Sequence, residues 1–247
     1  DRGVDKFQCE TTTKMNKVHF LYWLRCSLLL ALLHSTSGRK QMTYGAIREF
    51  TPYVGKDAVL ETRLKRAVSA MTKHGANSSI FKVIMGDRAG DYEIYNFYES
   101  VAAGAKAMQG FMSDPEMIAV NAERSANPIA EMRGPWVGRM LHNHMRGNVT
   151  TVTGVREYQV ARSDVPKMME LVPELQKITD AQDADLGVGV PLFSNDHSMM
   201  RVVYRFKDLD HWASSVDAIA NNQEFAALVE KANEIGTLMR SRVLMKL

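Results

Sequence analysis

The chain repeats its own pattern at an offset of 108 residues, and this repeat constrains its fold more than any other feature. Ile47-Arg48-Glu49-Phe50 aligns with Val155-Arg156-Glu157-Tyr158, and Asp114-Pro115-Glu116-Met117 aligns with Asn222-Gln223-Glu224-Phe225. Few residues are identical, but strand positions match strand positions and helix-capping positions match helix-capping positions. We therefore predict two copies of one structural unit.

Each copy is predicted to contain the element order βαββαβ. Alternating, strand-forming segments indicate strands, and apolar residues at helical spacing indicate helices. In the first copy we expect strands at 43–51, 79–85, 92–98 and 132–141, a helix at 56–73 and a second helix interrupted near Ser113. In the second copy we expect strands at 151–160, 186–193, 200–206 and 238–246, a helix at 164–181 kinked by Pro173, and a second helix interrupted near Asn221.

This element order is that of the ferredoxin-like split unit, in which the helices cover one face of a four-stranded sheet. The other face needs a partner, and the second copy supplies one. The predicted fold class is therefore α+β, with two ferredoxin-like repeats pairing their sheets into an intramolecular α/β barrel. We place the first repeat at 42–141, a linker at 142–150 and the second repeat at 151–247.

The N-terminal segment resembles a leader rather than a domain. Residues 1–14 carry no pattern that predicts a fold and are left unassigned. Residues 15–37 contain Lys17 and Arg25, then the apolar run 28–33, then small residues, as in a signal peptide. The run is too short for a membrane-spanning helix. We expect a secreted or periplasmic protein; the alternatives are a disordered tail and an organelle-targeting peptide, since 11–48 lacks acidic residues.

The net charge of +3 belongs to the leader, because residues 41–247 carry 24 basic and 25 acidic side chains. A nearly neutral body gives no electrostatic reason to expect nucleic-acid binding. Both cysteines, Cys9 and Cys26, also lie in the leader, so no cysteine metal site is expected in the body.

Two segments carry a resemblance to a known family. Phe206-Lys207-Asp208-Leu209-Asp210-His211-Trp212, followed by Asn222–Val229, resembles the third strand and broken second helix of the dimeric α/β barrel superfamily in its tandem fused form. Arg156-Glu157-Tyr158 resembles the opening strand of NIPSNAP-like members. The resemblance covers about residues 42–247 and implies the barrel fold, a cavity for a small apolar molecule and a capacity for homo-oligomers.

The superfamily includes antibiotic-biosynthesis-type monooxygenases, haem-degrading monooxygenases, polyketide cyclases, lactone isomerases and non-catalytic proteins. Its haem-degrading members depend on a histidine with supporting Asn and Trp. His211 and Trp212 bring haem into consideration, but a tryptophan at a helix start more often packs the helix on its sheet. The fold does not fix the function.

The candidate site residues come from the repeated strand and from the aromatic residues. Alternation places Arg48 with Phe50 on one face and Glu49 with Ile47 on the other. Glu49 and Glu157 could act as general bases; the alternative is a structural ion pair between the copies. We add His211 as a third catalytic candidate. Ligand-binding candidates are Arg48, Arg156, Tyr95, Tyr204 and Trp212.

No metal or organic cofactor is predicted. His142 and His144 share a face if their strand continues, but no third ligand is identifiable, and a solvated linker pair is the alternative. The sequence contains no glycine-rich phosphate loop and no nucleophile elbow.

Two functions therefore remain open. The first is an exported, cofactor-independent monooxygenase or isomerase that acts on an apolar metabolite. The second is a non-catalytic barrel that binds a ligand or a partner protein.

Overall fold

The computed structural model describes residues 42–247. The unassigned segment 1–14, the predicted signal peptide 15–37 and both cysteines lie outside the described residues. Within 42–247, no helix combines the length and the apolar character needed to cross a membrane.

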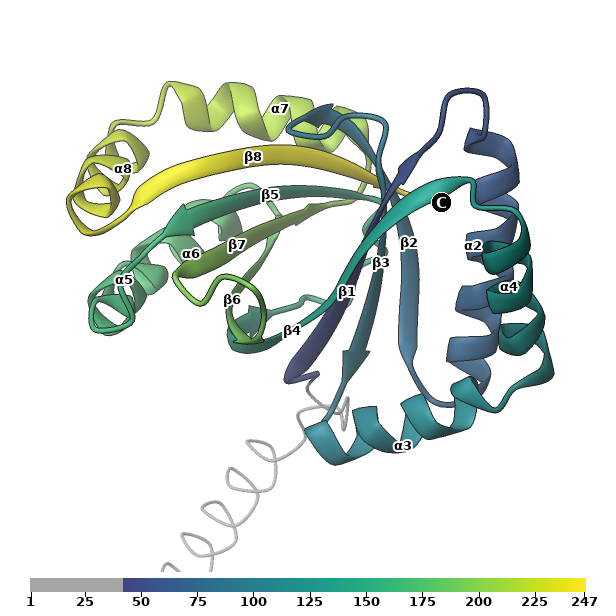
Figure 1. The fold of residues 1–247 in the computed structure, drawn as a ribbon. Helices are drawn as coiled ribbons and strands as arrows, with labels where there is room; N and C mark the ends of the chain where they lie inside the picture. Colours follow the sequence, from purple (N-terminus) through teal and green to yellow (C-terminus); the bar gives the residue numbers. More distant parts are fainter. Residues whose placement is uncertain (1–41) are drawn as a thin grey trace, which may run out of the picture. The chain divides into compact units, whose positions relative to one another are not determined.

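Eight strands form a closed, fully antiparallel barrel in which every strand has two hydrogen-bonded neighbours (Figure 1). The order around the barrel is β1-β3-β2-β8-β5-β7-β6-β4. The strands are β1 (Tyr44–Pro52), β2 (Asn77–Gly86), β3 (Tyr92–Tyr98), β4 (Ala130–His144), β5 (Val152–Gln159), β6 (Asp185–Phe193), β7 (Met199–Phe206) and β8 (Thr237–Lys246).

The helices cover the outside of the barrel, and each half of the chain supplies the helices of its own sheet (Figure 1). They are α2 (Asp57–Lys73), α3 (Val101–Met112), α4 (Pro115–Ala126), α5 (Val165–Glu170), α6 (Val172–Asp180), α7 (Leu209–Ala220) and α8 (Gln223–Ile235). Ser100 and Asp208 cap the N-termini of α3 and α7, where their side chains accept hydrogen bonds from the amides of Ala103 and His211.

Each half contributes four adjacent strands in an equivalent order, β4-β1-β3-β2 and β8-β5-β7-β6. The two halves meet along two seams, β2–β8 and β4–β6. The register of β1 on β3 and of β2 on β3 recurs in the second half at the same offset of 108 residues. Tyr44 pairs with Tyr98 as Val152 pairs with Phe206, for example.

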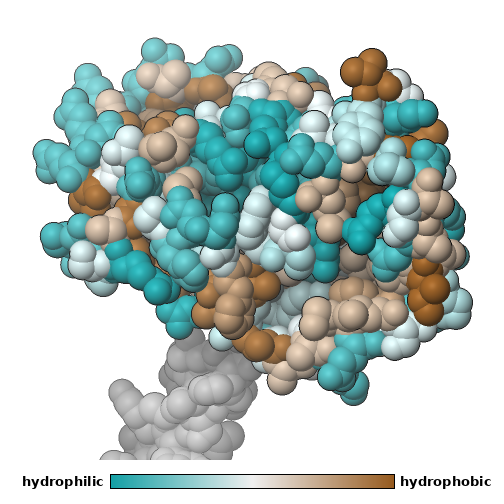
Figure 2. All heavy atoms as spheres, viewed as in Figure 1, coloured by the Kyte–Doolittle hydropathy of each residue, from teal (hydrophilic) through white to brown (hydrophobic). Residues whose placement is uncertain are grey.

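Strand alternation separates two environments. On β3, Tyr92 and Ile94 pack outward in the apolar core beneath the helices, whereas Tyr95 packs in a cluster that contains residues of both halves. On β7, Met200 and Val202 pack outward in the equivalent core of the second half. Figure 2 shows hydrophilic side chains over much of the visible face, with apolar side chains gathered mainly in its lower and right-hand parts.

Two elements differ from the sequence prediction. The helix expected at 164–181 is two helices, α5 and α6, which meet at Leu171. Pro166 and Pro173 lie in the first turns of α5 and α6, where a missing amide hydrogen is tolerated. β4 extends to His144, into the segment predicted as a linker, because residues 142–144 pair with residues 186–188 of β6.

The β2–β8 seam depends on a glycine. Gly86 has φ +87°, and a Cβ there would lie 2.8 Å from the Arg242 Cα and still closer to the Ser241 carbonyl oxygen. Gly90 has a similar φ of +100° but open space around it. An alanine at Gly90 would therefore carry the free-energy cost of the positive φ without the cost of a steric clash.

We expect Gly86→Ala to destabilise the barrel more than Gly90→Ala. The positive φ alone costs a residue with a Cβ about 1–2 kcal/mol. Forcing β8 away from β2 should add about 1–3 kcal/mol at Gly86. Urea denaturation of both variants measures the difference, and equal losses would contradict the proposed steric role of this glycine at the seam.

Candidate functional site

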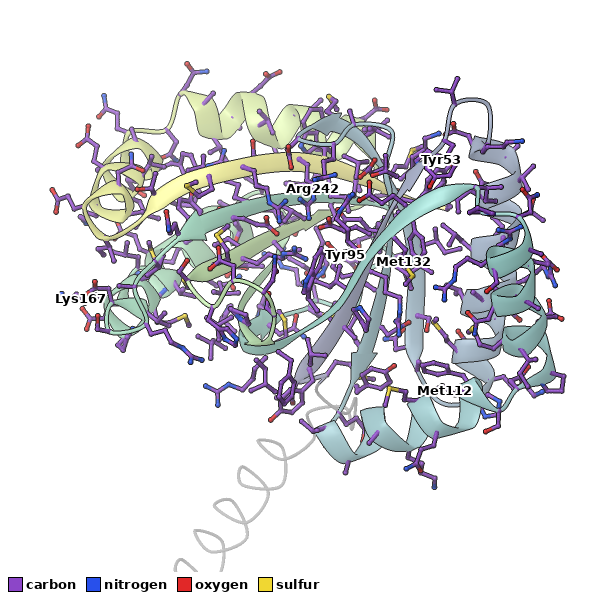
Figure 3. The ribbon with its side chains drawn as sticks, in the orientation of Figure 1. Tyr53, Tyr95, Met112, Met132, Lys167 and Arg242 are labelled. Atoms are coloured by element: carbon purple, nitrogen blue, oxygen red, sulfur yellow. The ribbon has the colours of Figure 1, made fainter. Side chains whose placement is uncertain are left out.

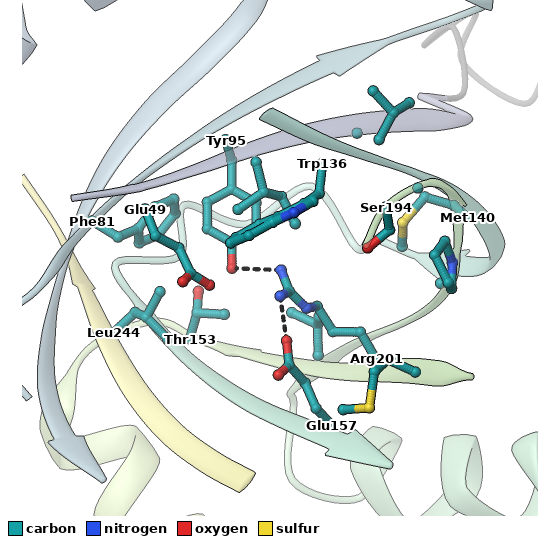
Figure 4. A pocket seen from close by; sticks show the side chains of 18 of the residues that line it. Glu49, Phe81, Tyr95, Trp136, Met140, Thr153, Glu157, Ser194, Arg201 and Leu244 are labelled. Atoms are coloured by element: carbon teal, nitrogen blue, oxygen red, sulfur yellow. Dashed lines mark hydrogen bonds and ion pairs between the residues drawn. The ribbon is translucent and has the colours of Figure 1, made fainter. Parts of the chain in front are cut away.

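A cavity of about 740 Å³ lies inside the barrel and is lined by residues of all eight strands (Figure 4). Its apolar wall includes Ile47, Phe81, Trp136 and Leu244. The ring of Tyr95 stands edge-on to Phe81, with the centroids 5.3 Å apart. A volume of this size accommodates a small organic ligand.

The lining is more basic than the chain as a whole. Seven basic side chains line the cavity against four acidic ones. The basic residues are Arg88, Arg133, Arg139, Arg201, Arg205, Arg240 and Lys246, and the acidic residues are Glu49, Asp87, Glu157 and Asp196. This excess of positive charge favours an anionic occupant.

Arg242 connects three buried glutamates from the two halves. Glu49 and Glu93 are register partners on β1 and β3, where two carboxylates side by side repel each other. The Arg242 guanidinium lies between them, with Nη2 3.3 Å from Glu49 Oε1 and Nε 2.7 Å from Glu93 Oε1. The same Nη2 lies 3.5 Å from Glu157 Oε1. The glutamates repeated in the sequence thus meet in one ion-pair network between the halves.

Glu157 is held as a carboxylate. Its partners besides Arg242 are Arg201 and Arg240, both in close ion pairs. Burial on its own raises the pKa of Glu157, but the three arginines outweigh burial and lower the pKa to about 2. Such a carboxylate is a weak base at neutral pH, so its geometry favours positioning Arg201 over accepting a substrate proton.

Tyr95 presents a hydroxyl to the cavity that is anchored on two sides. It donates a 2.7 Å hydrogen bond to Glu93 Oε2 and accepts one of 3.3 Å from Arg201 Nη1. Burial raises the pKa of Glu93, although Arg242 and Arg201 oppose the shift. Burial and the Glu93 carboxylate together raise the pKa of Tyr95 above its ordinary value. Tyr95 therefore remains protonated and connects the cavity to a buried carboxyl group that binds a proton more readily than usual.

Arg205 has one guanidinium nitrogen, Nη1, that is buried and has no hydrogen-bond partner among the described residues. Burial lowers the pKa of Arg205 while Asp185 and Tyr95 raise it, but guanidinium remains charged in proteins. Its register partner Asp185 accepts a hydrogen bond from the Arg146 amide and does not line the cavity. Gly187 leaves room for Arg205, since a Cβ there would lie 3.1 Å from Nη2.

The structure brings three of the predicted site residues to the cavity: Glu49, Glu157 and Tyr95. The other five do not share it. Arg48 lies on the helix-facing side of β1, and Arg156 and Tyr204 lie on the helix-facing sides of β5 and β7. His211 and Trp212 belong to α7. For the three strand residues, alternation explains the separation, because adjacent residues point to opposite faces of the sheet.

His211 and Trp212 have structural environments. The Lys207 amide donates to His211 Nδ1, so Nε2 carries the proton and donates to the Gln182 carbonyl at 2.6 Å. Trp212 packs beside Val152, Ala184 and Phe206. Both imidazole nitrogens are engaged, and within residues 42–247 no histidine lines the barrel cavity. A haem held by a histidine ligand therefore does not fit this cavity.

His142 and His144 lie on β4 and interact with α6. His142 Nε2 hydrogen-bonds to Gln176 Oε1 at 2.8 Å, and His144 Nε2 lies 3.6 Å from Asp180 Oδ1. In the described part of the chain no three His, Cys, Asp or Glu residues are grouped as metal ligands.

The sequence reasoning missed Glu93, Arg201, Arg205 and Arg242. A signal was available in the residues themselves. Arg201, Val203 and Arg205 alternate on β7 with Met200, Val202 and Tyr204, so two arginines share the face opposite the apolar one. On a strand predicted to be buried on both faces, such arginines indicate a polar cavity.

No known protein-family profile and no curated protein matches the chain. Solved structures do resemble it. A candidate monooxygenase from Lactobacillus acidophilus has a TM-score of 0.56 and 11% identity, covering 83% of this chain and 94% of its own. A candidate monooxygenase from Fusobacterium nucleatum has a TM-score of 0.59 and 11% identity, covering 83% of this chain and 93% of its own. An anthrone oxidase-like protein has a TM-score of 0.59 and 13% identity, covering 84% of this chain and 92% of its own.

These structures share the fold of this chain over most of its length and of their own. At such low identity the similarity establishes the fold alone. The fold predicted from the sequence is therefore confirmed at the level of an α+β protein with a closed antiparallel barrel.

We expect Glu157→Gln and Glu93→Gln to change stability in opposite ways with pH. Because the pKa of Glu157 is about 2 in the folded protein, its ionisation stabilises the fold above the ordinary carboxyl pKa. That contribution, about 3 kcal/mol from the size of the shift, disappears as the pH falls from about 5 to 2. The free-energy gap between wild type and Glu157→Gln should therefore close over this range.

Glu93 serves as the matched control, since its pKa is raised. A raised pKa stabilises the fold at low pH and loses that effect as the pH rises. Glu93→Gln should therefore cost much less than Glu157→Gln at neutral pH. Urea denaturation from pH 2 to 8 measures both gaps, and parallel pH curves for the two variants would contradict the assignment.

Proposed function

We propose that the barrel binds a small, largely apolar molecule carrying an anionic oxygen, and oxidises or isomerises it without an organic cofactor. The observation that carries this proposal is the buried, unpartnered Nη1 of Arg205 in a cavity with apolar walls and an excess of basic side chains. A buried guanidinium N–H without an acceptor is unfavourable for stability, so an anionic ligand that accepts a hydrogen bond from it compensates on binding.

The chemistry uses the Tyr95–Glu93 pair. A proton leaves an acidic carbon or hydroxyl of the substrate for the Tyr95 oxygen as the Tyr95 proton moves to Glu93. The substrate anion that remains is stabilised by Arg205. Return of the proton at another carbon gives an isomer. Alternatively, dioxygen as the oxidant converts an activated methylene to a ketone with release of water, which is the monooxygenase outcome.

The wider predictions from the sequence form part of the proposal. We propose that the halves are two paired ferredoxin-like repeats, and their shared strand register supports this. The similarity to NIPSNAP-like members in 156–158 remains a prediction. Export through the segment 15–37, to a secreted or periplasmic location, also remains a proposal that rests on the leader pattern alone.

A non-catalytic barrel is the second candidate, and one observation favours it. Glu49 and Glu157, the two bases expected from the sequence, are engaged in ion pairs with arginines. Under this reading the cavity binds its ligand and does not transform it. Turnover measured separately from binding distinguishes the two candidates.

We expect Tyr95→Phe to lose turnover while retaining binding. Anthrone is a suitable first probe because one structural neighbour is anthrone oxidase-like, and oxygen uptake with anthraquinone formation measures the reaction. Removal of the proton-transfer hydroxyl should slow turnover about 100-fold or more. Anthrone binding without turnover by the wild type would favour the non-catalytic barrel for this probe. Mass spectrometry of co-purifying ligands would identify better substrates.

We expect Arg205→Met to abolish the preference for an anion. Calorimetric titration with 2-naphthoate and its neutral counterpart 2-naphthamide measures this preference. A hydrogen bond to a charged group contributes about 1.5–3 kcal/mol, so 2-naphthoate should bind about 10- to 100-fold more weakly to the variant. The affinity for 2-naphthamide should change little.

Arg139→Met is the matched control, since Arg139 lines the same cavity but is exposed. It should leave both affinities nearly unchanged. If Arg139→Met and Arg205→Met weakened 2-naphthoate binding equally, general electrostatic attraction would replace Arg205 as the anchor.

A further inference from the structure

A second cavity, of about 260 Å³, lies in the first half between the outer face of the sheet and helices α2, α3 and α4. Five methionines line it: Met71, Met108, Met112, Met117 and Met132. Figure 3 shows two of them, Met112 at the end of α3 and Met132 on β4. Methionine side chains adapt to irregular apolar shapes, so this lining suits a flexible apolar ligand.

Arg48 brings a charge into this apolar space. Its Nη1 is buried without a hydrogen-bond partner, and it forms no ion pair with any residue of the described chain. Burial lowers the pKa of Arg48, yet the guanidinium stays charged. The other basic lining residues are Arg63, which pairs with Glu123, and Arg124; no acidic side chain lines this cavity.

The second half shows the same position with its partners in place. Arg156 occupies on β5 the register that Arg48 occupies on β1, opposite Val202 and Ile94, respectively. Its guanidinium carbon lies 6.0 Å from the centre of the Tyr204 ring and 5.8 Å from that of Phe225. These contacts are attractive for a cation. The cavity there is only about 50 Å³.

The first half lacks those rings. At the offset of 108 residues, Asn96 replaces Tyr204 and Met117 replaces Phe225. Asn96 is itself engaged, accepting a 2.7 Å hydrogen bond from Ser78. The two substitutions thus accompany a larger cavity and an arginine without an aromatic partner. In the second half, the two rings contact the arginine and the cavity is small.

We propose that this cavity is a second binding site, separate from the barrel, for a medium-chain aliphatic carboxylate. The carboxylate accepts a hydrogen bond from Arg48 Nη1, and the alkyl chain packs among the methionines. A single cation surrounded by apolar side chains fits a monoanion with an apolar body better than a multiply charged phosphate.

The test uses octanoate and its neutral counterpart 1-octanol, with the protein labelled with ¹³C on the methionine methyl groups. Octanoate should shift the NMR signals of Met108, Met112, Met117 and Met132. Met140 and Met199 line the barrel cavity, so their signals report binding there instead. The Arg205→Met variant serves as the background, because it removes the proposed anion site of the barrel.

Arg48→Met should weaken octanoate binding at least 10-fold while leaving 1-octanol binding unchanged. Arg156→Met is the matched control and should leave octanoate binding unchanged. Met117→Phe restores the ring found in the second half, so it should abolish octanoate binding and raise the melting temperature. This variant also tests the site if Arg48→Met does not fold.

Three results would overturn the proposal: octanoate leaving the signals of Met108, Met112, Met117 and Met132 unmoved, octanoate and 1-octanol binding equally, or Arg48→Met binding octanoate as the wild type does. Shifts confined to Met140 and Met199 would also overturn it. The first three results leave the barrel proposal untouched, because its test uses different ligands, whereas shifts at Met140 and Met199 would place octanoate in the barrel cavity.

Discussion

The barrel depends on how Arg242 is paired. Glu49 and Glu93 come from the first half and Glu157 from the second, and all three carboxylates lie within 3.5 Å of this one guanidinium. Buried charges of one sign are tolerated only when a counter-charge is fixed among them. A shift of β8 along β2 by one residue would turn Arg242 to the outer face and leave the glutamates without it. The seam and its register are therefore linked to this network.

The same network separates the charged cavity residues that are already paired with one another from the groups that can contact a ligand. Glu49 and Glu157 are occupied by arginines, and Arg201 is occupied by Glu157 and Tyr95. The groups that we propose for the ligand are the Tyr95 hydroxyl, backed by Glu93, and the unpartnered Nη1 of Arg205. We therefore expect the chemistry at these two groups, beside the ion-pair network, and not at the glutamates within it.

The sequence predicted the architecture better than the site, for a physical reason. The offset of 108 residues and strand alternation are local signals, and they gave the element order and the faces of Glu49 and Arg48. Which charges meet depends on partners far along the chain, as with Arg242 and Glu49. The extension of β4 to His144 likewise depends on pairing with β6, and the secondary-structure propensity of a segment does not reveal a pairing partner far along the chain.

The shared register of β1-β3-β2 and β5-β7-β6 has a consequence for how a ligand can lie. Where the first half has Glu93, Tyr95 and Phe97 in succession on its inner face, the second has Arg201, Val203 and Arg205. A barrel assembled from two identical chains would have to present the same side chains on both sides of its axis. A single chain is free of that requirement, so a ligand in this cavity would meet Tyr95 and Phe97 on one side and Arg201 and Arg205 on the other.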